Sequence, residues 1–183
     1  MLEEIIIAGF GGQGVLSLGQ TLAYAAMLEG KEVTWMPSYG PEMRGGTANC
    51  ITILSDSAIS SPIISVFDTA IVLNQPSMDK FGPKVKKDGL LVYESTNIMT
   101  VSDRKDIKIF GIPAAEAANK LNNTRVANMI LLGSYLAKKP VVKIDSIIQA
   151  LSEVLPERYH HLLPLNRQAL ETGLELIETV KVQ

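Results

Sequence analysis

The stretch Glu4-Ile5-Ile6-Ile7-Ala8-Gly9-Phe10-Gly11-Gly12-Gln13-Gly14 decides the fold class. Its first half is continuously apolar and rich in β-branched residues, which predicts a strand buried on both faces. The glycines then follow the pattern G-x-G-x-x-G, and residues 15–29 place apolar side chains at helical spacing before Gly30, a suitable C-terminal cap. Residues 31–37 read as a second strand. The beginning of the chain therefore predicts a right-handed βαβ unit.

The rest of the chain continues to alternate strand and helix patterns. The connection before residue 47 is too short for a crossover helix, so the strand that begins there is expected to run antiparallel to its predecessor. The expected strands are residues 47–54, 69–74, 90–93 and 107–112. A helix that carries Met78, Phe81 and Val85 is expected to end at Asp88-Gly89. The later expected helices are residues 114–121, 125–137, 144–155 and 165–180, and Gly133 is expected to be a point of close packing in the second of these. No repeat or linker-like stretch interrupts them, so one domain over residues 1–183 is expected.

Composition excludes several classes of protein. The net charge of −2 gives no general attraction for phosphate backbones, so we expect no nucleic-acid partner. The single cysteine, Cys50, cannot form a disulfide within the chain or a four-cysteine iron–sulfur or zinc site. No run approaches the roughly 18 apolar residues that span a bilayer, and the acidic start does not resemble a secretory signal. We therefore expect no membrane contact and a cytoplasmic location.

The glycine segment between the first strand and helix suits an anionic ligand. Glycines let backbone N–H groups approach a phosphate at the positive N-terminus of a helix. A dinucleotide site would also need an acidic residue at the end of the second strand, but that strand ends Trp35-Met36-Pro37-Ser38. NAD or FAD held by this chain alone is therefore disfavoured. The alternative is that the glycines only permit a tight turn.

A second glycine-rich segment, Ser38-Tyr39-Gly40-Pro41-Glu42-Met43-Arg44-Gly45-Gly46, follows the second strand. It begins at the strand end where ligands of open α/β sheets collect. Arg44 could hold a carboxylate or phosphate through two parallel hydrogen bonds. Alternatively, Arg44 is a surface residue paired with Glu42.

Together the two segments resemble one known family. The ordered pair GFGGQGV (residues 9–15) and PSYGPEMRGG (residues 37–46), with Arg125-Val126-Ala127-Asn128-Met129 later in the chain, resembles the gamma subunit of 2-oxoacid:ferredoxin oxidoreductases. The resemblance covers nearly the whole chain. It implies a three-layer α/β/α sandwich, whose central sheet would be mostly parallel but mixed because of the antiparallel strand.

The resemblance also implies a function within a larger enzyme. Such enzymes oxidatively decarboxylate a 2-oxoacid with thiamine diphosphate and magnesium, transfer the acyl group to coenzyme A (CoA), and pass electrons through iron–sulfur clusters to ferredoxin. The implied partners are alpha, beta and delta-type subunits, and ferredoxin through the complex. A separate short chain favours 2-oxoglutarate as substrate, with pyruvate, branched-chain 2-oxoacids and indolepyruvate as alternatives. Lys87-Asp88-Gly89 reads as a turn and not as a thiamine motif. We therefore assign no cofactor firmly to this chain alone. We also expect no catalytic residue and no metal site on this chain alone.

Two other hypotheses are a free-standing CoA- or nucleotide-binding protein and a scaffold whose glycine segment touches only protein. The residues expected to bind the cofactor are Gly9, Gly11, Gly12, Gln13, Gly14, Ser38, Tyr39, Arg44 and Gly45. Outside this group, Cys50 is expected to be a buried structural residue, and His160 and His161 are expected in an exposed turn or a subunit contact. Asn74 and Glu94 end two strands, where they could line the same crevice or cap the following helices.

Overall fold

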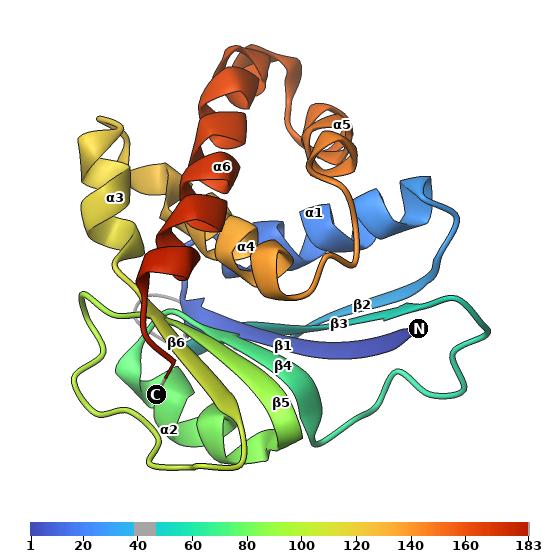
Figure 1. Cartoon of the computed structure of the whole chain (residues 1–183). Helices are drawn as coiled ribbons and strands as arrows, with labels where there is room; N and C mark the ends of the chain where they lie inside the picture. The colour runs from blue at the N-terminus through green and yellow to red at the C-terminus, as the bar shows by residue number, and fades with distance from the viewer. Residues whose placement is uncertain (39–46, 183) are drawn as a thin grey trace.

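The computed structural model describes residues 1–38 and 47–182, and its centre is a six-stranded sheet (Figure 1). In chain order the strands are β1 (Leu2–Phe10), β2 (Glu32–Ser38), β3 (Thr47–Ser55), β4 (Phe67–Val72), β5 (Val85–Glu94) and β6 (Lys108–Ile112). Their spatial order is β2-β3-β1-β4-β5-β6. β3 is antiparallel to both of its neighbours, whereas the other neighbouring pairs are parallel. The predicted mixed, mostly parallel sheet is therefore confirmed.

The antiparallel strand lies inside the predicted βαβ unit. β3 pairs with β1 on one side and with β2 on the other, so the helix that follows β1 crosses over β3 before the chain returns in β2. The ends of β2 and β3 nearest to each other in sequence, at Ser38 and Thr47, thus lie at the same end of the sheet as Phe10.

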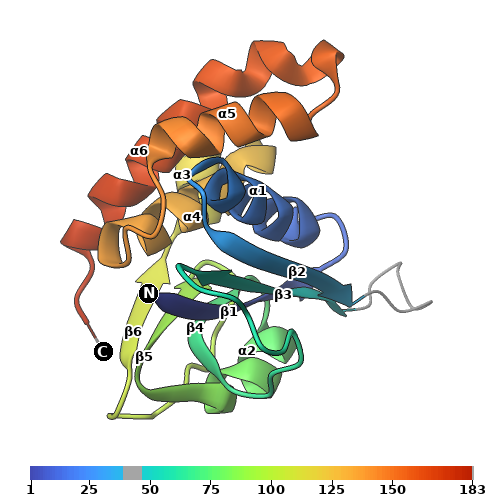
Figure 2. The same ribbon diagram turned by 90° about the vertical axis from the view of Figure 1, so that its right-hand side faces the viewer.

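Helices cover both faces of the sheet unequally. They are α1 (Val15–Leu28), α2 (Gln75–Phe81), α3 (Ala114–Lys120), α4 (Ala127–Lys138), α5 (Ile144–Val154) and α6 (Leu163–Thr179), with 3₁₀ turns at Gly82–Lys84, Thr124–Val126 and Glu157–Leu162. Figures 1 and 2 show α1, α4, α5 and α6 over one face and α2 under the other. The three-layer α/β/α arrangement is confirmed, with one thin layer. Across residues 1–38 and 47–182, no helix combines the length and the apolar character needed to cross a membrane.

β1 contributes to a separate apolar cluster on each side of the sheet. Ile5 and Ile7 are fully buried among side chains of α1, α4 and α6. Ile6 and Ala8 point to the other side, toward Met78 of the α2 layer. Successive side chains of a strand point to opposite faces, so a strand covered on both faces must be apolar throughout. This confirms the interpretation of the first apolar run.

Two glycines allow α4 and α6 to touch. A Cβ atom on Gly133 would collide with the carbonyl oxygen of Leu170, and one on Gly173 would collide with that of Ile130. The Ser134 hydroxyl donates to the Gly173 carbonyl at 2.9 Å across the same contact. The predicted close-packing role of Gly133 is confirmed, and its partner surface is the last helix.

The boundary between α2 and β5 differs from the prediction. The helix was expected to carry Val85 and to end at Asp88-Gly89, but α2 ends at Phe81. Val85, Asp88 and Gly89 belong to β5. Their stretch forms an irregularity in the pairing of β4 with β5, and Asp88 has a φ of 63°. Val85 lies four residues after Phe81, a spacing that also suits a helix, so the pattern alone did not reveal the strand.

Candidate functional site

The glycine turn joins the C-terminal end of β1 to the N-terminus of α1. Gly12 and Gly14 have φ values of 95° and 76°, in the left-handed region that favours glycine. Gly14 is also the N-cap residue of α1, and a side chain there would collide with the amide of Asn128. These two glycines are therefore required by the path of the backbone.

Gln13 stabilises the turn from within. Its Oε1 accepts from the N–H of Phe10 at 2.6 Å, and its Nε2 donates to the carbonyl of Leu73 at 3.2 Å, which ties the turn to the end of β4. The backbone N–H of Gln13 donates to the Phe10 carbonyl at 3.2 Å. Gln13, expected to contact a phosphate, thus has its own N–H engaged inside the turn.

Gly9 also has an internal role. A Cβ atom on Gly9 would lie 2.7 Å from the Gln13 Oε1 and 2.9 Å from the Cβ of Leu73. The absence of a side chain at Gly9 makes room for the Gln13 amide. The predicted ligand contacts of Gly9 and Gln13 stay predictions, but the structure provides a packing reason for both residues.

Backbone donors around the turn have no acceptor among the described residues. The N–H groups of Gly11, Gly12 and the segment 14–17 make no hydrogen bond with residues 1–38 or 47–182. The first N–H groups of a helix have no intrahelical partner and form its positive end. They face a pocket of about 360 Å³ whose lining includes Gly11, Gly12, Gly14 and Ser17. This geometry suits a phosphate or carboxylate.

A second pocket adjoins the glycine turn. It has a volume of about 420 Å³ and shares Ser17 with the first, and its lining includes Arg125, Asn128 and His161. Asn128 links the second pocket to the glycine turn, because its Nδ2 donates to the carbonyl of Gly14 at 3.3 Å. Arg125 is exposed and has no ion-pair partner in the part of the chain that the structure describes.

Sequence reasoning gave Arg125 no place in the candidate site, although the structure brings it into the lining of the second pocket. It stood in the quoted segment Arg125-Val126-Ala127-Asn128-Met129 but received no role, because 111 residues separate it from Gly14 (125 − 14). The usable signal was an arginine just before the N-terminus of a helix, on a segment that also carried the family resemblance.

The arginine segment predicted to join the site is described only at its ends. Ser38 is exposed at the end of β2 and pairs with Asn49, which in turn pairs with Ala8 just before the turn. Thr47, where β3 begins, pairs with Phe10. Both ends therefore lie at the same sheet end as the glycine turn. Tyr39, Arg44 and Gly45 lie outside the described residues, so their roles stay predictions.

Asn74 and Glu94 cap helices at this end of the sheet. The Asn74 Oδ1 accepts from the N–H of Ser77 at 2.9 Å at the start of α2. The buried Glu94 carboxylate accepts from the N–H groups of Thr96, Asn97 and Ala115, the last of these in the first turn of α3. Capping, one of the two alternatives from the sequence, is confirmed for both.

The cysteine and the histidines offer no nucleophilic arrangement. Cys50 is fully buried, and burial raises the pKa of its thiol to about 12, so the reactive thiolate is disfavoured. The prediction of a buried structural cysteine is confirmed. His160 and His161 lie in the 3₁₀ turn at Glu157–Leu162, where a ring nitrogen of His160 is 2.9 Å from the Leu155 carbonyl oxygen.

The side chains of this chain fit only some of the groups that the resemblance implies. One cysteine cannot ligate an iron–sulfur cluster. Among residues 1–38 and 47–182, no three His, Cys, Asp or Glu side chains come together as a metal site would require. The unpaired N–H groups at α1 do fit a phosphate, the group through which CoA or a nucleotide would bind.

Comparisons with known proteins agree with the resemblance. The model of the family described as pyruvate ferredoxin/flavodoxin oxidoreductase matches residues 4–176. A ketoisovalerate oxidoreductase subunit VorA from Methanothermobacter thermautotrophicus is 44% identical over 94% of this chain, which spans only 36% of that relative. A 2-oxoglutarate synthase subunit KorC from Methanocaldococcus jannaschii is 31% identical over 86% of both chains.

A solved structure shares the whole fold. The gamma subunit of a keto/oxoacid ferredoxin oxidoreductase from Geobacter sulfurreducens PCA is 28% identical, covers 99% of each chain and superposes with a TM-score of 0.84. Since the family model covers almost the full length and the sequence relatives agree with it, the chain belongs to the pyruvate ferredoxin/flavodoxin oxidoreductase family.

Proposed function

We propose that the chain acts as a gamma-type subunit of a 2-oxoacid:ferredoxin oxidoreductase complex and that its glycine turn binds phosphate groups of CoA. The observation that carries the binding role is the set of unpaired N–H groups of residues 14–17 facing a pocket at the N-terminus of α1. Family membership supplies the reaction class.

The two adjoining pockets suit a ligand with two separated anionic groups. CoA carries a diphosphate and a 3′-phosphate on the same nucleotide. The N–H groups of the turn would hold one of these groups, and the unpaired guanidinium of Arg125 would hold the other through charge-assisted hydrogen bonds. Asn128 would keep the turn in place by its bond to the Gly14 carbonyl.

Other subunits would supply the redox chemistry. This chain has one cysteine and therefore leaves cluster ligation to its partners. The proposed partners are the alpha, beta and delta-type subunits, with ferredoxin receiving electrons through the complex. The role of this chain would be to position CoA so that its thiol reaches the acyl group formed on a partner.

The sequence relatives favour a branched-chain 2-oxoacid as the first substrate to test. The ketoisovalerate relative is 44% identical, against 31% for the 2-oxoglutarate relative. The 2-oxoglutarate predicted from the sequence stays the alternative. Turnover of the purified complex with 3-methyl-2-oxobutanoate, 2-oxoglutarate and pyruvate would rank them by kcat/KM.

Calorimetry with CoA tests the binding role. Wild type should bind CoA, and Arg125→Gln should bind it at least about tenfold more weakly, because a hydrogen bond to a charged group contributes about 1.5–3 kcal/mol. Lys105→Gln, which removes an exposed positive charge elsewhere, should leave the affinity unchanged. No heat with CoA, or equal affinities in all three proteins, would contradict the role. Copurification of the chain with thiamine- and cluster-binding subunits tests the assembly separately.

A further inference from the structure

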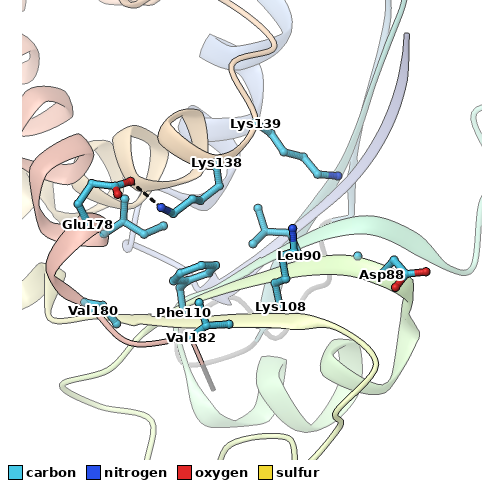
Figure 3. Close-up of a pocket in the computed structure, with 11 residues that line it drawn as sticks. Asp88, Leu90, Lys108, Phe110, Lys138, Lys139, Glu178, Val180 and Val182 are labelled. Atoms are coloured by element: carbon cyan, nitrogen blue, oxygen red, sulfur yellow. Dashed lines mark hydrogen bonds and ion pairs between the residues drawn. The ribbon is translucent and has the colours of Figure 1, made fainter.

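A third pocket lies at the other end of the sheet, where β6 begins and α4 and α6 end. Its volume is about 480 Å³, within the range of small-molecule sites. Figure 3 shows side chains entering it from both layers, Lys108 from β6 and Lys138 from α4. The glycine turn lies at the opposite ends of the parallel strands, so the two sites are separate.

Three lysines surround this pocket, and one of them lacks a counterion. Lys138 pairs with Glu178 at 2.5 Å, and Lys139 pairs with the buried Glu3 at 2.8 Å. Lys108 has no ion-pair partner in residues 1–38 and 47–182. Figure 3 shows the carboxylate of Asp88, also at the pocket, turned away from the lysines. Within the described residues, Lys108 and Asp88 are therefore the charged groups of the lining without an ion-pair partner. Lys108 is the ammonium that can pair with the anionic group of a ligand without displacing a protein carboxylate.

The floor of the pocket is apolar. Leu90, Phe110 and Ile177 line it and are almost fully buried. The ammonium of Lys138 lies 5.3 Å from the centre of the Phe110 ring, so charge and apolar surface meet at one place. Since these three side chains are already buried, the apolar surface left for a ligand to cover belongs to Val180 and Val182 in the same lining. An anion with a hydrocarbon body would cover that surface, whereas a hydrated inorganic anion would not.

The ion pair at the rim can give way to a ligand. The Glu178 side chain is 66% exposed and that of Lys138 is 27% exposed. Exposed pairs of this kind contribute about 0–1 kcal/mol, so a second carboxylate could replace Glu178 at little cost. Each ammonium also carries three donors, which lets Lys138 hold Glu178 and a ligand together.

We propose that this pocket binds a small apolar monocarboxylate, with its anionic group between Lys108 and Lys138 and its hydrocarbon body against Val180 and Val182. The unpaired ammonium of Lys108 matches one carboxylate, and the apolar surface of Val180 and Val182 matches an aliphatic or aromatic body. The proposal is independent of CoA binding at the glycine turn.

Calorimetry of the full chain with butanoate, hexanoate and octanoate tests the proposal. Affinity should rise along the series by up to about fourfold per CH₂ group, because burying each group contributes about 0.8 kcal/mol. Hexan-1-ol should not bind measurably. Lys108→Gln should weaken octanoate binding about tenfold or more. Val182→Asp should weaken it too, since it adds a negative charge to the lining at a position that is 59% exposed and thus tolerant.

The matched control is Lys105→Gln, an exposed lysine outside the pocket, which should bind octanoate as wild type does. Equal binding by the Lys108 and Lys105 variants would overturn the proposal, as would equal binding of hexanoate and hexan-1-ol. Absence of carboxylate binding, even if an acidic peptide bound at the same place, would overturn it as well.

Discussion

The two ends of the sheet treat polar groups in opposite ways. At the carboxyl ends of the parallel strands, the glycine turn leaves a row of backbone N–H groups without acceptors in the described structure. At the amino ends, charged side chains mostly satisfy one another: Glu3 accepts from Thr69 and Lys139, and Lys86 bridges Glu4 and Asp68. The first end is therefore open to a ligand, whereas the second mainly stabilises the fold.

This contrast explains the use of backbone at one end and of side chains at the other. Backbone donors held by glycines and by Gln13 need no side-chain ordering when a ligand arrives, which favours a preformed phosphate site. Side chains that form ion pairs with one another neutralise each other's charges and leave none free for a ligand. Lys108 is one of the charged side chains at the amino end that have no ion-pair partner among the described residues, and it is there that we propose the carboxylate pocket.

The largest expected effect is on stability, from Glu3→Ala. The Glu3 side chain is only 7% exposed, and its loss strands Lys139 and the Thr69 hydroxyl. Breaking a buried pair costs about 3–5 kcal/mol, and the 28% exposure of the Lys139 side chain places this pair at the low end. Urea unfolding should therefore show a loss of up to about 3 kcal/mol. Glu3→Gln should lose less because it still accepts from Thr69. CoA affinity should not change in either protein, and a parallel loss of CoA binding would remove the separation between the two ends.

Gly14→Ala should affect both stability and binding. Its φ of 76° and the collision with Asn128 predict a loss of about 2 kcal/mol, together with CoA binding weakened more than about tenfold. Gly30→Ala is the matched control, with a φ of 77° and open space around the added methyl group. It should be destabilised but bind CoA normally. Similar CoA affinities in the two variants would argue against a binding role for the turn.

Gln13→Ala should have a smaller effect at the same end. It removes the bonds to the Phe10 N–H and the Leu73 carbonyl, with an expected loss of about 1 kcal/mol or somewhat more. CoA affinity should fall several-fold because the turn is held less firmly. Thermal unfolding and calorimetry measure the two effects. A stable variant with unchanged CoA affinity would show that the Gln13 side chain does not position the turn.

Asp106→Asn should have the smallest effect, and one that depends on pH. Hydrogen bonds from the Arg104 guanidinium lower the pKa of the Asp106 carboxyl from its ordinary value of 3.8. A lowered pKa in the folded state means that the stabilisation is present above pH 3.8 and is lost as the pH falls through the folded pKa. The midpoints of thermal unfolding of wild type and variant should therefore converge as the pH falls below 3.8. A difference between the midpoints that stays constant as the pH falls would refute the ion pair as the cause.

Local patterns in the sequence predicted the elements whose causes are local. The apolar run of β1, the glycine turn and the antiparallel direction of β3 follow from neighbouring residues, and all three are confirmed. The predicted end of α2 was wrong because Val85 fits a helical spacing as well as a strand. The helix-capping role of Asn74 was predicted only as one of two alternatives, since capping a helix and lining a crevice need the same residue types.

Features made by distant residues could not be read from the sequence. Asn128 meets Gly14 across 114 positions, and Lys139 meets Glu3 across 136. No local spacing signals such pairs. The second pocket, which Arg125 lines, and the third pocket, which Lys108 lines, therefore appear only when α4 is packed on the sheet. Arg44, central to the predicted site, lies outside the described residues and remains a prediction.

Amide NMR spectra of the ¹⁵N-labelled chain during a CoA titration test the central claim most directly. Binding of phosphate to the free N–H groups predicts the largest shifts at Gly12, Gly14 and residues 15–17, smaller shifts at Arg125, and none at Lys108. Shifts confined to other parts of the sheet, with residues 14–17 unchanged, would contradict it.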